Sequence, residues 1–500
     1  MSEPSNQRTV SLHDGPVDPA LAGLEPPSVW RCFGDLARIP RKTGNEAGVR
    51  AYVKAFAERH NIAYEENNVG DVLLRVNPGT QGTIVGVQAH MDMVCVSRDG
   101  APFDFDREPI RLKRDGDFVT ADGTSLGADN GIGVAYALAL AEETQGPLEV
   151  LLTVDEEQGF TGIEGVAPGW LRARFLINLD SEEEGYLTIA SAGGRDFLVR
   201  LPAERRAPAT SIAAFEVTVD GLKGGHSGVE IHRGRTNALK VMSRVLASAK
   251  AYAGVVFGIN GGTAPNVIPS AARAVVGVPA DRSSEFQRRV AELRTSLLTE
   301  EDPALRIELT PAQDNRPPLT AAASDRLIRL FDDIPSGVIV PSPRDPTQPF
   351  VSNNLAIVKD ASDGGFELTM MSRSPATEEL EKLEGRYRSI AEQNGASVSA
   401  GKVVPGWSPN YDSPLLARFQ KKYGELYGKT AKILEIHAGL ECGALQGKYP
   451  GMDLISVGPD ITNVHSPDER VSVESTRRTF DLVRAVIRDL QSDTPAGQSA

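Results

Sequence analysis

Short apolar runs that end in histidine or acidic side chains recur in the first part of the chain. Residues 83–89 are mostly apolar and lead to His90 and Asp92, while residues 148–154 and 175–179 are apolar runs followed by acids. Runs of this length are typical of strands buried on both faces of a sheet. In an open α/β sheet, side chains at the carboxyl ends of such strands line the ligand crevice. The pattern therefore predicts a polar cluster at one edge of a sheet.

The spacing of apolar residues changes style along the chain. Strand and helix patterns alternate in the α/β manner up to about residue 205, and an α+β pattern then runs to about residue 400. Past residue 405 the α/β style returns. We therefore predict an α/β fold with a mixed, mostly parallel sheet between helices, plus an inserted α+β domain. The predicted segments are a flexible N-terminal arm (1–25), the first part of the α/β domain (26–205), the inserted domain (206–400) and the second part of the α/β domain (401–500).

Composition narrows the class of partner. The chain has 500 residues, of which 40% are hydrophobic and 24% charged, as in a soluble globular protein of two or three domains. Its formal net charge of -14 argues against nucleic acid or an anionic membrane as a partner, because both need a basic surface. No apolar run approaches the ~20 residues of a membrane helix, and the polar start lacks the apolar core of a signal peptide. We expect a cytoplasmic protein that acts on a small molecule.

Cysteine and histidine usage limits the kind of metal site. Cys32, Cys95 and Cys442 have no paired spacing, so any metal must bind to histidine and carboxylates. His90 and Asp92 are two residues apart, which in extended chain places both side chains on one side. Asp92 could then bind the far ring nitrogen of His90 and fix the tautomer that a metal requires. The alternative is an ordinary hydrogen-bonded histidine near a strand end.

Further acids are predicted at the same edge of the sheet. Asp129 lies among glycines at the start of a helix, Asp155, Glu156 and Glu157 follow one strand, and Asp180 follows another. Crowded carboxylates repel one another by several kcal/mol in a low dielectric unless a cation compensates, which favours a metal. Two alternatives stay open: Asp129 could be a helix N-cap, and the acids could form a solvated rim.

Several short motifs follow one another along the chain. They are His90-x-Asp92, Gly127-Ala-Asp129-Asn-Gly131, Glu156-Glu157, Asp180-Ser-Glu-Glu, Lys223-Gly-Gly-His226-Ser-Gly and His465-Ser-Pro-Asp-Glu469, together with His437-Ala-Gly-Leu-Glu-Cys-Gly443 and Asn178-Leu-Asp-Ser-Glu-Glu-Glu184. In this order the motifs resemble the M20 metallopeptidases, most closely the bacterial aminoacyl-histidine dipeptidase branch, whose members are also called cytosolic non-specific dipeptidases. The similarity covers nearly all of the chain after residue 25.

The resemblance implies a centre of two divalent metal ions. His90 and Asp180 would bind one ion, and Glu157 and His465 would bind the other. Asp129 would bridge the two. Each ion then has three protein ligands and an open position, as catalytic zinc requires. Zinc suits this set of ligands best, and manganese and cobalt suit it as well.

The resemblance also assigns residues to the chemistry. Asp92 would orient His90, and Glu156 would be the general base that takes a proton from a metal-bound water and passes it to the leaving amine. Because Asp155, Glu156 and Glu157 are consecutive, spacing alone does not identify the base, and the similarity to the family favours Glu156. Related enzymes also imply a cis peptide bond after Asp129.

For the inserted domain, the resemblance implies a lid and a homodimer interface. His226 would reach an active site to stabilise the oxyanion, in its own chain or across the dimer. Asn266 and Arg373 match positions that contact substrate, and Arg373 could bind a carboxylate in a bidentate manner. For both, ordinary surface polarity is the alternative. In the second part of the α/β domain, Glu441 would bind the free amine of the substrate and Gly439 would allow its close approach.

The function implied is that of a metal-dependent dipeptidase. It would hydrolyse unblocked dipeptides, either carnosine-like Xaa-His substrates or a broader set. An N-acyl amino acid deacylase of the same family is the main alternative, and a metal-free, non-catalytic homologue is a third possibility. A nucleotide-binding α/β protein is disfavoured because residues 127–133 do not match the G-x-G-x-x-G spacing.

Overall fold

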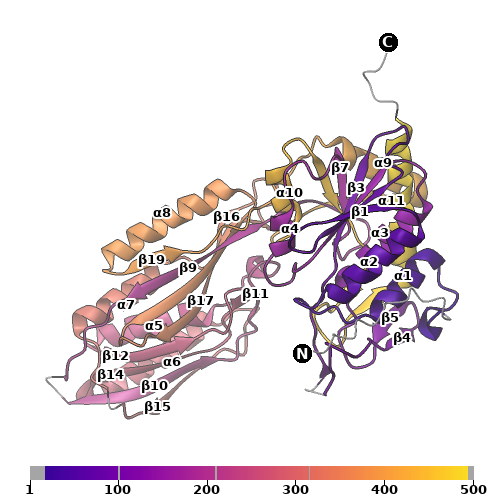
Figure 1. Cartoon of the computed structure of the whole chain (residues 1–500). Coiled ribbons are helices and arrows are strands. Elements are labelled where there is room, and N and C mark those ends of the chain that lie inside the picture. The colour runs from indigo at the N-terminus through magenta and orange to yellow at the C-terminus, as the bar shows by residue number, and fades with distance from the viewer. Residues whose placement is uncertain (1–16, 99–101, 209–210, 315, 494–500) are drawn as a thin grey trace, which may run out of the picture. The chain divides into compact units, whose positions relative to one another are not determined.

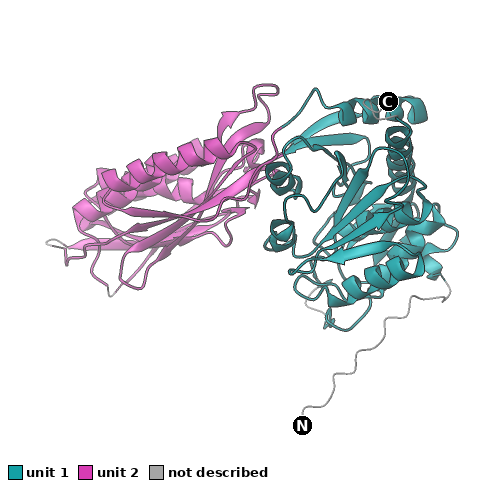
Figure 2. Cartoon of the chain, turned by 45° about the horizontal axis from the view of Figure 1, so that its top comes forward, with its two compact units in different colours: residues 1–190, 409–435, 440–500 teal, residues 191–408, 436–439 magenta. Residues whose placement is uncertain are grey.

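The chain forms two compact units in a computed structural model that describes residues 17–98, 102–208, 211–314 and 316–493 (Figure 2). Unit 1 consists of Met1–Ala190, Pro409–Glu435 and Leu440–Ala500, and unit 2 of Ser191–Ser408 and Ile436–Gly439. Unit 2 is therefore an insertion in the sequence of unit 1. Among the described residues no helix combines the length and the apolar character needed to cross a membrane.

Unit 1 is built on an eight-stranded mixed sheet in the order β1-β2-β6-β3-β7-β21-β8-β20. Figure 1 labels β1, β3 and β7 of this sheet. Its central strands β6, β3, β7 and β21 are parallel, with His90 opposite Thr153 and Gln88 opposite Asn178. All six residues of β3 and of β6 are buried, as the apolar runs predicted. The strands are β1 (Ala63–Glu66), β2 (Val72–Val76), β3 (Val85–His90), β6 (Leu148–Thr153), β7 (Phe175–Asn178), β8 (Tyr186–Ser191), β20 (Lys432–Ile436) and β21 (Asp453–Ser456).

Helices cover this sheet, and α3 is its central helix. It packs against β3 and β6 and against α1 and α11, and is buried from Asn130 to Ala141. A small four-stranded sheet, β22-β23-β5-β4, lies beside them. The remaining elements of unit 1 are α1 (Pro27–Ala37), α2 (Ala47–Arg59), β4 (Leu112–Asp115), β5 (Phe118–Ala121), α3 (Ala128–Glu143), α4 (Thr161–Gly165), α9 (Pro414–Tyr427), α10 (Cys442–Lys448), β22 (Ile461–Thr462), β23 (Arg470–Ser472) and α11 (Val473–Ser492).

Unit 2 is an antiparallel sheet in the order β15-β10-β14-β12-β17-β18-β9-β19, with β16 paired to β17. Its helices form a layer in the order α6, α5, α7, α8, in which neighbours contact each other. The elements are β9 (Gly193–Leu201), β10 (Ile212–Asp220), β11 (Gly225–His226), α5 (Ala238–Ala251), β12 (Val255–Gly261), β13 (Val267–Ile268), β14 (Ala272–Pro279), α6 (Ser283–Leu297), β15 (Arg306–Pro311), α7 (Ala321–Asp333), β16 (Gly337–Pro341), β17 (Pro349–Asp360), β18 (Phe366–Ser374), α8 (Thr377–Gln393) and β19 (Ser397–Ala400).

The predicted fold class is confirmed, with local differences. Strands β8, β9, β11, β13, β16, β22 and β23 and helices α4 and α10 were not predicted. Residues 1–16 of the predicted N-terminal arm lie outside the described residues. Unlike a loosely held arm, its remainder forms a short 3-10 helix, Pro19–Leu21, because Leu21 is buried in the core of unit 1.

Candidate active site

Five residues predicted as metal ligands lie together at one edge of the sheet of unit 1. They come from the end of β3, the start of α3, the loops after β6 and β7, and the loop before β23. The residues are His90, Asp129, Glu157, Asp180 and His465. Their ligand atoms form two overlapping groups, each within 4.8 Å, and Asp129 belongs to both.

The two groups are arranged around the two oxygens of Asp129. His90 Nε2 lies 3.2 Å from Asp129 Oδ1 and 3.3 Å from Asp180 Oδ1. His465 Nε2 lies 3.0 Å from Asp129 Oδ2 and 3.1 Å from both carboxylate oxygens of Glu157. Each carboxylate oxygen of Asp129 therefore faces a different imidazole. The predicted cis peptide bond between Asp129 and Asn130 is confirmed.

Asp92 is fully buried beside His90. Its Oδ1 lies 3.3 Å from His90 Nδ1, although the two atoms do not have hydrogen-bond geometry. It accepts hydrogen bonds from the Glu156 and Glu157 N–H groups, at 3.1 and 3.3 Å, and from the Thr43 hydroxyl at 2.9 Å. Burial alone would raise the pKa of Asp92, but these hydrogen bonds and His90 outweigh it and lower the pKa to about 2.

The three consecutive acids after β6 point to different partners. Asp155 accepts a hydrogen bond from the Thr161 hydroxyl at 2.6 Å, and Glu157 contacts His465. Glu156 Oε2 lies 3.9 Å from His90 Nε2. Burial raises the pKa of Glu156 well above its usual value, and nearby acids add to the shift despite the opposing charge of His90.

The carboxylates of the site are crowded together, and burial favours their protonated forms. Burial raises the pKa of Asp180 to about 6, although His90 opposes the shift. The pKa of Glu441 is raised by burial to about 8. A divalent cation would compensate this crowding, and imidazole and carboxylate are ligands that zinc, manganese and cobalt accept. The residues present therefore fit a pair of divalent ions.

Glu441 lies beneath this cluster and is fully buried. Its Oε2 accepts hydrogen bonds from the Thr153 hydroxyl, at 2.7 Å, and from the side-chain amide of Gln88. Gln88 in turn accepts a hydrogen bond from Asn178 at 2.6 Å. The other oxygen, Oε1, is buried without a hydrogen-bond partner. One buried carboxylate oxygen is thus left for a donor from a ligand.

In unit 2, His226 is in β11, and Asn266 lies directly before the partner strand β13. His226 pairs with Val267, and the carbonyl of Asn266 accepts the Ser227 N–H at 2.8 Å. His226 Nδ1 accepts the N–H groups of Gly228 and Val229, at 3.2 and 3.3 Å. The proton of the neutral ring is therefore on Nε2, which makes that atom a donor.

Arg373 is a buried cation on β18, and the residue is only 7% exposed. It lies opposite Ser352, whose hydroxyl is 2.7 Å from His437 Nε2. Burial lowers the pKa of Arg373 to about 10, although Asp196 opposes the shift, and its Nε has no hydrogen-bond partner. Gly439, two residues after His437, is half-buried in the same unit.

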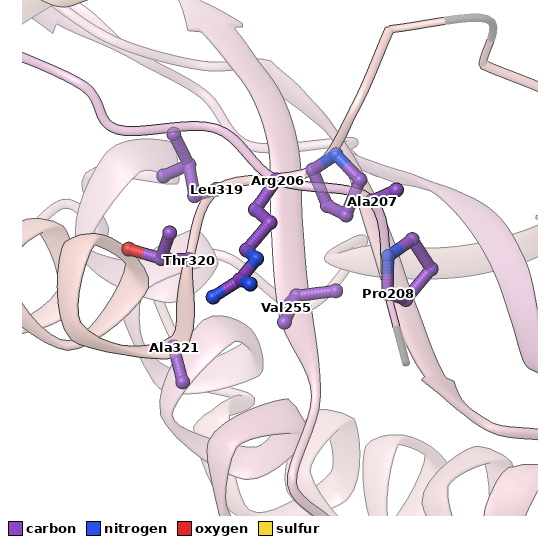
Figure 3. A pocket seen from close by; sticks show the side chains of 8 residues that line it. Arg206, Ala207, Pro208, Val255, Leu319, Thr320 and Ala321 are labelled. Carbon is purple, nitrogen blue, oxygen red and sulfur yellow. The ribbon is translucent and has the colours of Figure 1, made fainter. Parts of the chain in front are cut away.

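A cavity of about 570 Å³ also lies in unit 2, next to the start of α7 (Figure 3). Its lining contains none of the predicted site residues. The lining residues are Arg206, Ala207, Pro208, Val255, Pro318, Leu319, Thr320 and Ala321.

Two buried charged residues next to the cluster had no predicted role. Glu469 and Arg41 are 2% and 3% exposed and bind the backbone that carries Asp129. Glu469 could have been found from one signal in the sequence, because it ends the motif that contains His465. Arg41 had no signal, because its backbone partners lie at least 50 residues away in sequence.

Comparisons with known proteins agree with this architecture. Residues 86–489 match peptidase family M20/M25/M40. This match covers most of the chain, and the chain therefore belongs to that family of hydrolases.

Individual relatives cover almost the whole chain. It is 38% identical to the cytosol non-specific dipeptidase of Escherichia coli K12, over 94% of this chain and 99% of the relative. The crystal structure of aminoacylhistidine dipeptidase from Vibrio alginolyticus matches with a TM-score of 0.84 and 33% identity, over 94% and 98% of the two chains. A Staphylococcus aureus tripeptidase, at 14% identity and a TM-score of 0.53 over 94% and 100% of the chains, shares the fold.

Proposed function

We propose that this protein is a cytoplasmic, metal-dependent dipeptidase that hydrolyses unblocked dipeptides, of Xaa-His or broader composition. The names of the Escherichia coli and Vibrio relatives support the substrate class, and the first also supports the location. The observation that carries the proposal is that two clusters of possible metal ligands, each with one histidine, share Asp129.

Two divalent ions, most suitably zinc, would be held by the five clustered residues. His90 and Asp180 would bind one ion, Glu157 and His465 the other, and Asp129 both. When bound, such a pair polarises the scissile carbonyl and makes water nucleophilic at neutral pH. The burial of His90 and its contact with Asp92 would keep the imidazole in one orientation.

Glu156 would act as the general base. It lies beside His90 and, unlike Asp155, it has no side-chain hydrogen bond to a neighbouring hydroxyl among the described residues. Neighbouring cations would oppose the rise in its pKa and favour the ionised form, which can accept a proton from water and return it to the leaving amine.

The two charged ends of a dipeptide need opposite partners. Glu441 Oε1 would accept the substrate ammonium, with Gly439 allowing close approach. Arg373 would bind the terminal carboxylate, and its buried Nε without a partner supports this role. His226 would donate from Nε2 to the oxyanion, and Asn266 would contact the substrate beside it.

Unit 2 would serve as lid and homodimer interface. Val338 and Val340 are each 40% exposed on β16, which pairs with β17 alone among the described residues. Exposed apolar residues on a strand edge favour association with another chain. Light scattering on the purified protein measures whether it is a dimer.

A substrate panel tests the function. We expect hydrolysis of β-alanyl-histidine or alanyl dipeptides in the presence of zinc or manganese, at least tenfold slower hydrolysis of their N-acetyl forms, and loss of activity with a chelator. Faster hydrolysis of the N-acetyl forms would instead favour the deacylase, and activity that survives complete metal removal would contradict the proposal.

Glu441→Gln tests recognition of the amine. Removal of one charge-assisted interaction is expected to raise KM for unblocked dipeptides by about 10- to 100-fold. The N-acetyl substrates serve as the control, because they carry no ammonium group and their KM should not change. An equal rise in KM for both substrates would remove this role from Glu441.

A further inference from the structure

Four consecutive backbone N–H groups donate to one buried carboxylate. The N–H groups of Leu126 and Gly127 lie 2.8 and 3.0 Å from Glu469 Oε2. Those of Ala128 and Asp129 lie 2.7 and 3.2 Å from Oε1. Hydrogen bonds to an ionised acceptor are about twice as strong as neutral ones. Glu469 therefore accepts every N–H of the turn formed by residues 126–129, which ends at Asp129.

Arg41 binds the same turn through one carbonyl group, that of Gly127. It donates to the carbonyls of Met91 and Asp92, at 3.1 and 2.9 Å, and to the carbonyl of Gly127. Gly127 has a φ of +70°, and a Cβ there would lie 2.5 Å from Arg41 Nη2. Glu469 and Arg41 attract each other electrostatically, so the turn is held between opposite charges. Arg41 also connects the turn to the chain that follows His90.

Glu469 connects the turn to the loop of the second histidine. It is four residues after His465, and its own N–H donates to the Ser466 carbonyl at 3.1 Å. The loop that carries His465 and the turn that carries Asp129 are therefore joined through one side chain. Neither oxygen of Glu469 is directed at a candidate metal ligand side chain, since both are used by backbone N–H groups.

We propose that Glu469, with Arg41 on the other side of the turn, is a positioning residue for the bridging carboxylate. It fixes the backbone so that the two oxygens of Asp129 face His90 and His465 at once. The two halves of the metal site are thereby coupled, and loss of Glu469 weakens the binding of both ions together. This inference rests on the proposed binuclear site.

Glu469→Gln tests the proposal in the full-length protein. The variant keeps the size of the side chain but replaces one acceptor oxygen with an NH₂ group that faces backbone donors. Binding of Zn²⁺ and Mn²⁺ is measured by competition with a chromophoric chelator, together with the number of ions bound. We expect about 10- to 100-fold weaker binding of both ions. At saturating metal, kcat should fall while KM stays within about twofold, because the groups proposed to bind the substrate are unchanged.

Glu149→Gln is the matched control. Glu149 is 3% exposed in the same unit and accepts the N–H groups of Arg172 and Ala173 at 2.8 and 3.0 Å. Its carboxylate also pairs with Arg75 and, among the described residues, binds none of the clustered residues. Its substitution should lower the thermal stability of the metal-free protein and leave ion affinity within about twofold.

The outcomes separate the inference from the proposed function. If the wild-type protein binds no divalent ions, the proposed function fails first. If it binds two ions and Glu469→Gln binds them equally well, the positioning role is wrong. An equal loss of affinity in Glu149→Gln also overturns it. Should Glu469→Gln not fold, Arg41→Lys tests the other side of the turn, and unchanged ion affinity there contradicts the proposal.

Discussion

Asp129 directs its carboxylate away from the helix that it starts. The N-cap position of α3 is taken by Gly127, in a left-handed conformation, and Asp129 itself has non-helical φ and ψ angles of -78° and 111°. Its side chain contacts His90 and His465 instead of the free N–H groups of the first turn. Glu469 accepts the N–H groups of Ala128 and Asp129, and among the described residues no backbone N–H donates to either carboxylate oxygen of Asp129. The N-cap alternative for Asp129 is therefore excluded.

Glu156→Gln tests the proposed base at the scale of one residue. The substitution removes a proton acceptor but none of the five proposed ligands. We expect kcat to fall by about 10²- to 10⁴-fold while two equivalents of metal remain bound. Steady-state kinetics and metal analysis of the same preparation measure both quantities.

Asp155→Asn is the control for this substitution. It makes the same change of charge in the neighbouring residue, whose carboxylate accepts a hydrogen bond from Thr161. Activity should stay within about threefold of the wild type, as for a substitution away from the reacting groups. Equal losses in the two variants would argue against Glu156 as the base.

At the scale of elements, α3 meets the ends of two strands through Asn130. The Asn130 side chain accepts the His90 N–H at 3.3 Å and donates to the Leu179 carbonyl at 2.7 Å. One turn later, Gly133 leaves room for this side chain. A Cβ at Gly133 would overlap Asn130 Oδ1 and lie 2.6 Å from the Leu179 carbonyl oxygen. The helix can approach the strands this closely because position 133 has no side chain.

Gly133→Ala is therefore expected to destabilise unit 1. Ala normally favours a helix over Gly by about 1 kcal/mol, but overpacking costs about 1–3 kcal/mol where the neighbours cannot move. Displacement of Asn130 should also weaken metal binding through the end of β3. Thermal unfolding and ion affinity measure the two effects.

Gly385→Ala in α8 gives the opposite expectation. Position 385 is exposed, and a Cβ there would meet nothing within 4 Å. Helix propensity then dominates, and the transition temperature should rise slightly or stay unchanged. A stabilising Gly133→Ala variant would contradict the close packing of α3.

The sequence predicted elements better than it predicted their contacts. Strands β3, β6 and β7 and their polar ends were found because buried strands give continuous apolar runs. Strand β8 was missed, since Thr188 interrupts its apolar residues and Ser191 ends it, although both are buried. The bonds between Glu469 and the turn join residues about 340 positions apart, which no local pattern reveals.

Across the whole molecule, the stability of the metal-free protein depends on pH, because the folded state buries acids that the unfolded state exposes. The net charge is -14, and buried acids of unit 1 have raised pKa values, about 6 for Asp180 and about 8 for Glu441, mainly through burial. In the unfolded chain such acids have a pKa of about 4. Between these values the folded state holds more protons than the unfolded state. Stability therefore falls as pH rises through this window.

His465 acts in the same direction. Hydrogen bonds to Asp129 and Glu157 raise the pKa of His465 to about 11. The folded metal-free chain therefore keeps the ring proton at pH values above the usual histidine pKa of about 6.5. The stability that this proton gives is present at low pH and is lost as pH rises. The low pKa of Asp92, about 2, has the opposite sign, but its effect is confined to strongly acidic solution.

We therefore expect the transition temperature of the metal-free protein to fall between pH 5 and pH 8, as followed by scanning calorimetry. Bound ions replace the protons, so zinc or manganese should stabilise the protein much more at pH 8 than at pH 5, where protons compete for the same carboxylates and imidazoles. At 100 times Kd the gain is about 2.7 kcal/mol for each independent site. Glu441→Gln should flatten the fall, because the new amide does not titrate. Stability of the metal-free protein that rises with pH in this range, or equal stabilisation by metal at both pH values, would mean that the acids are not gathered around cations.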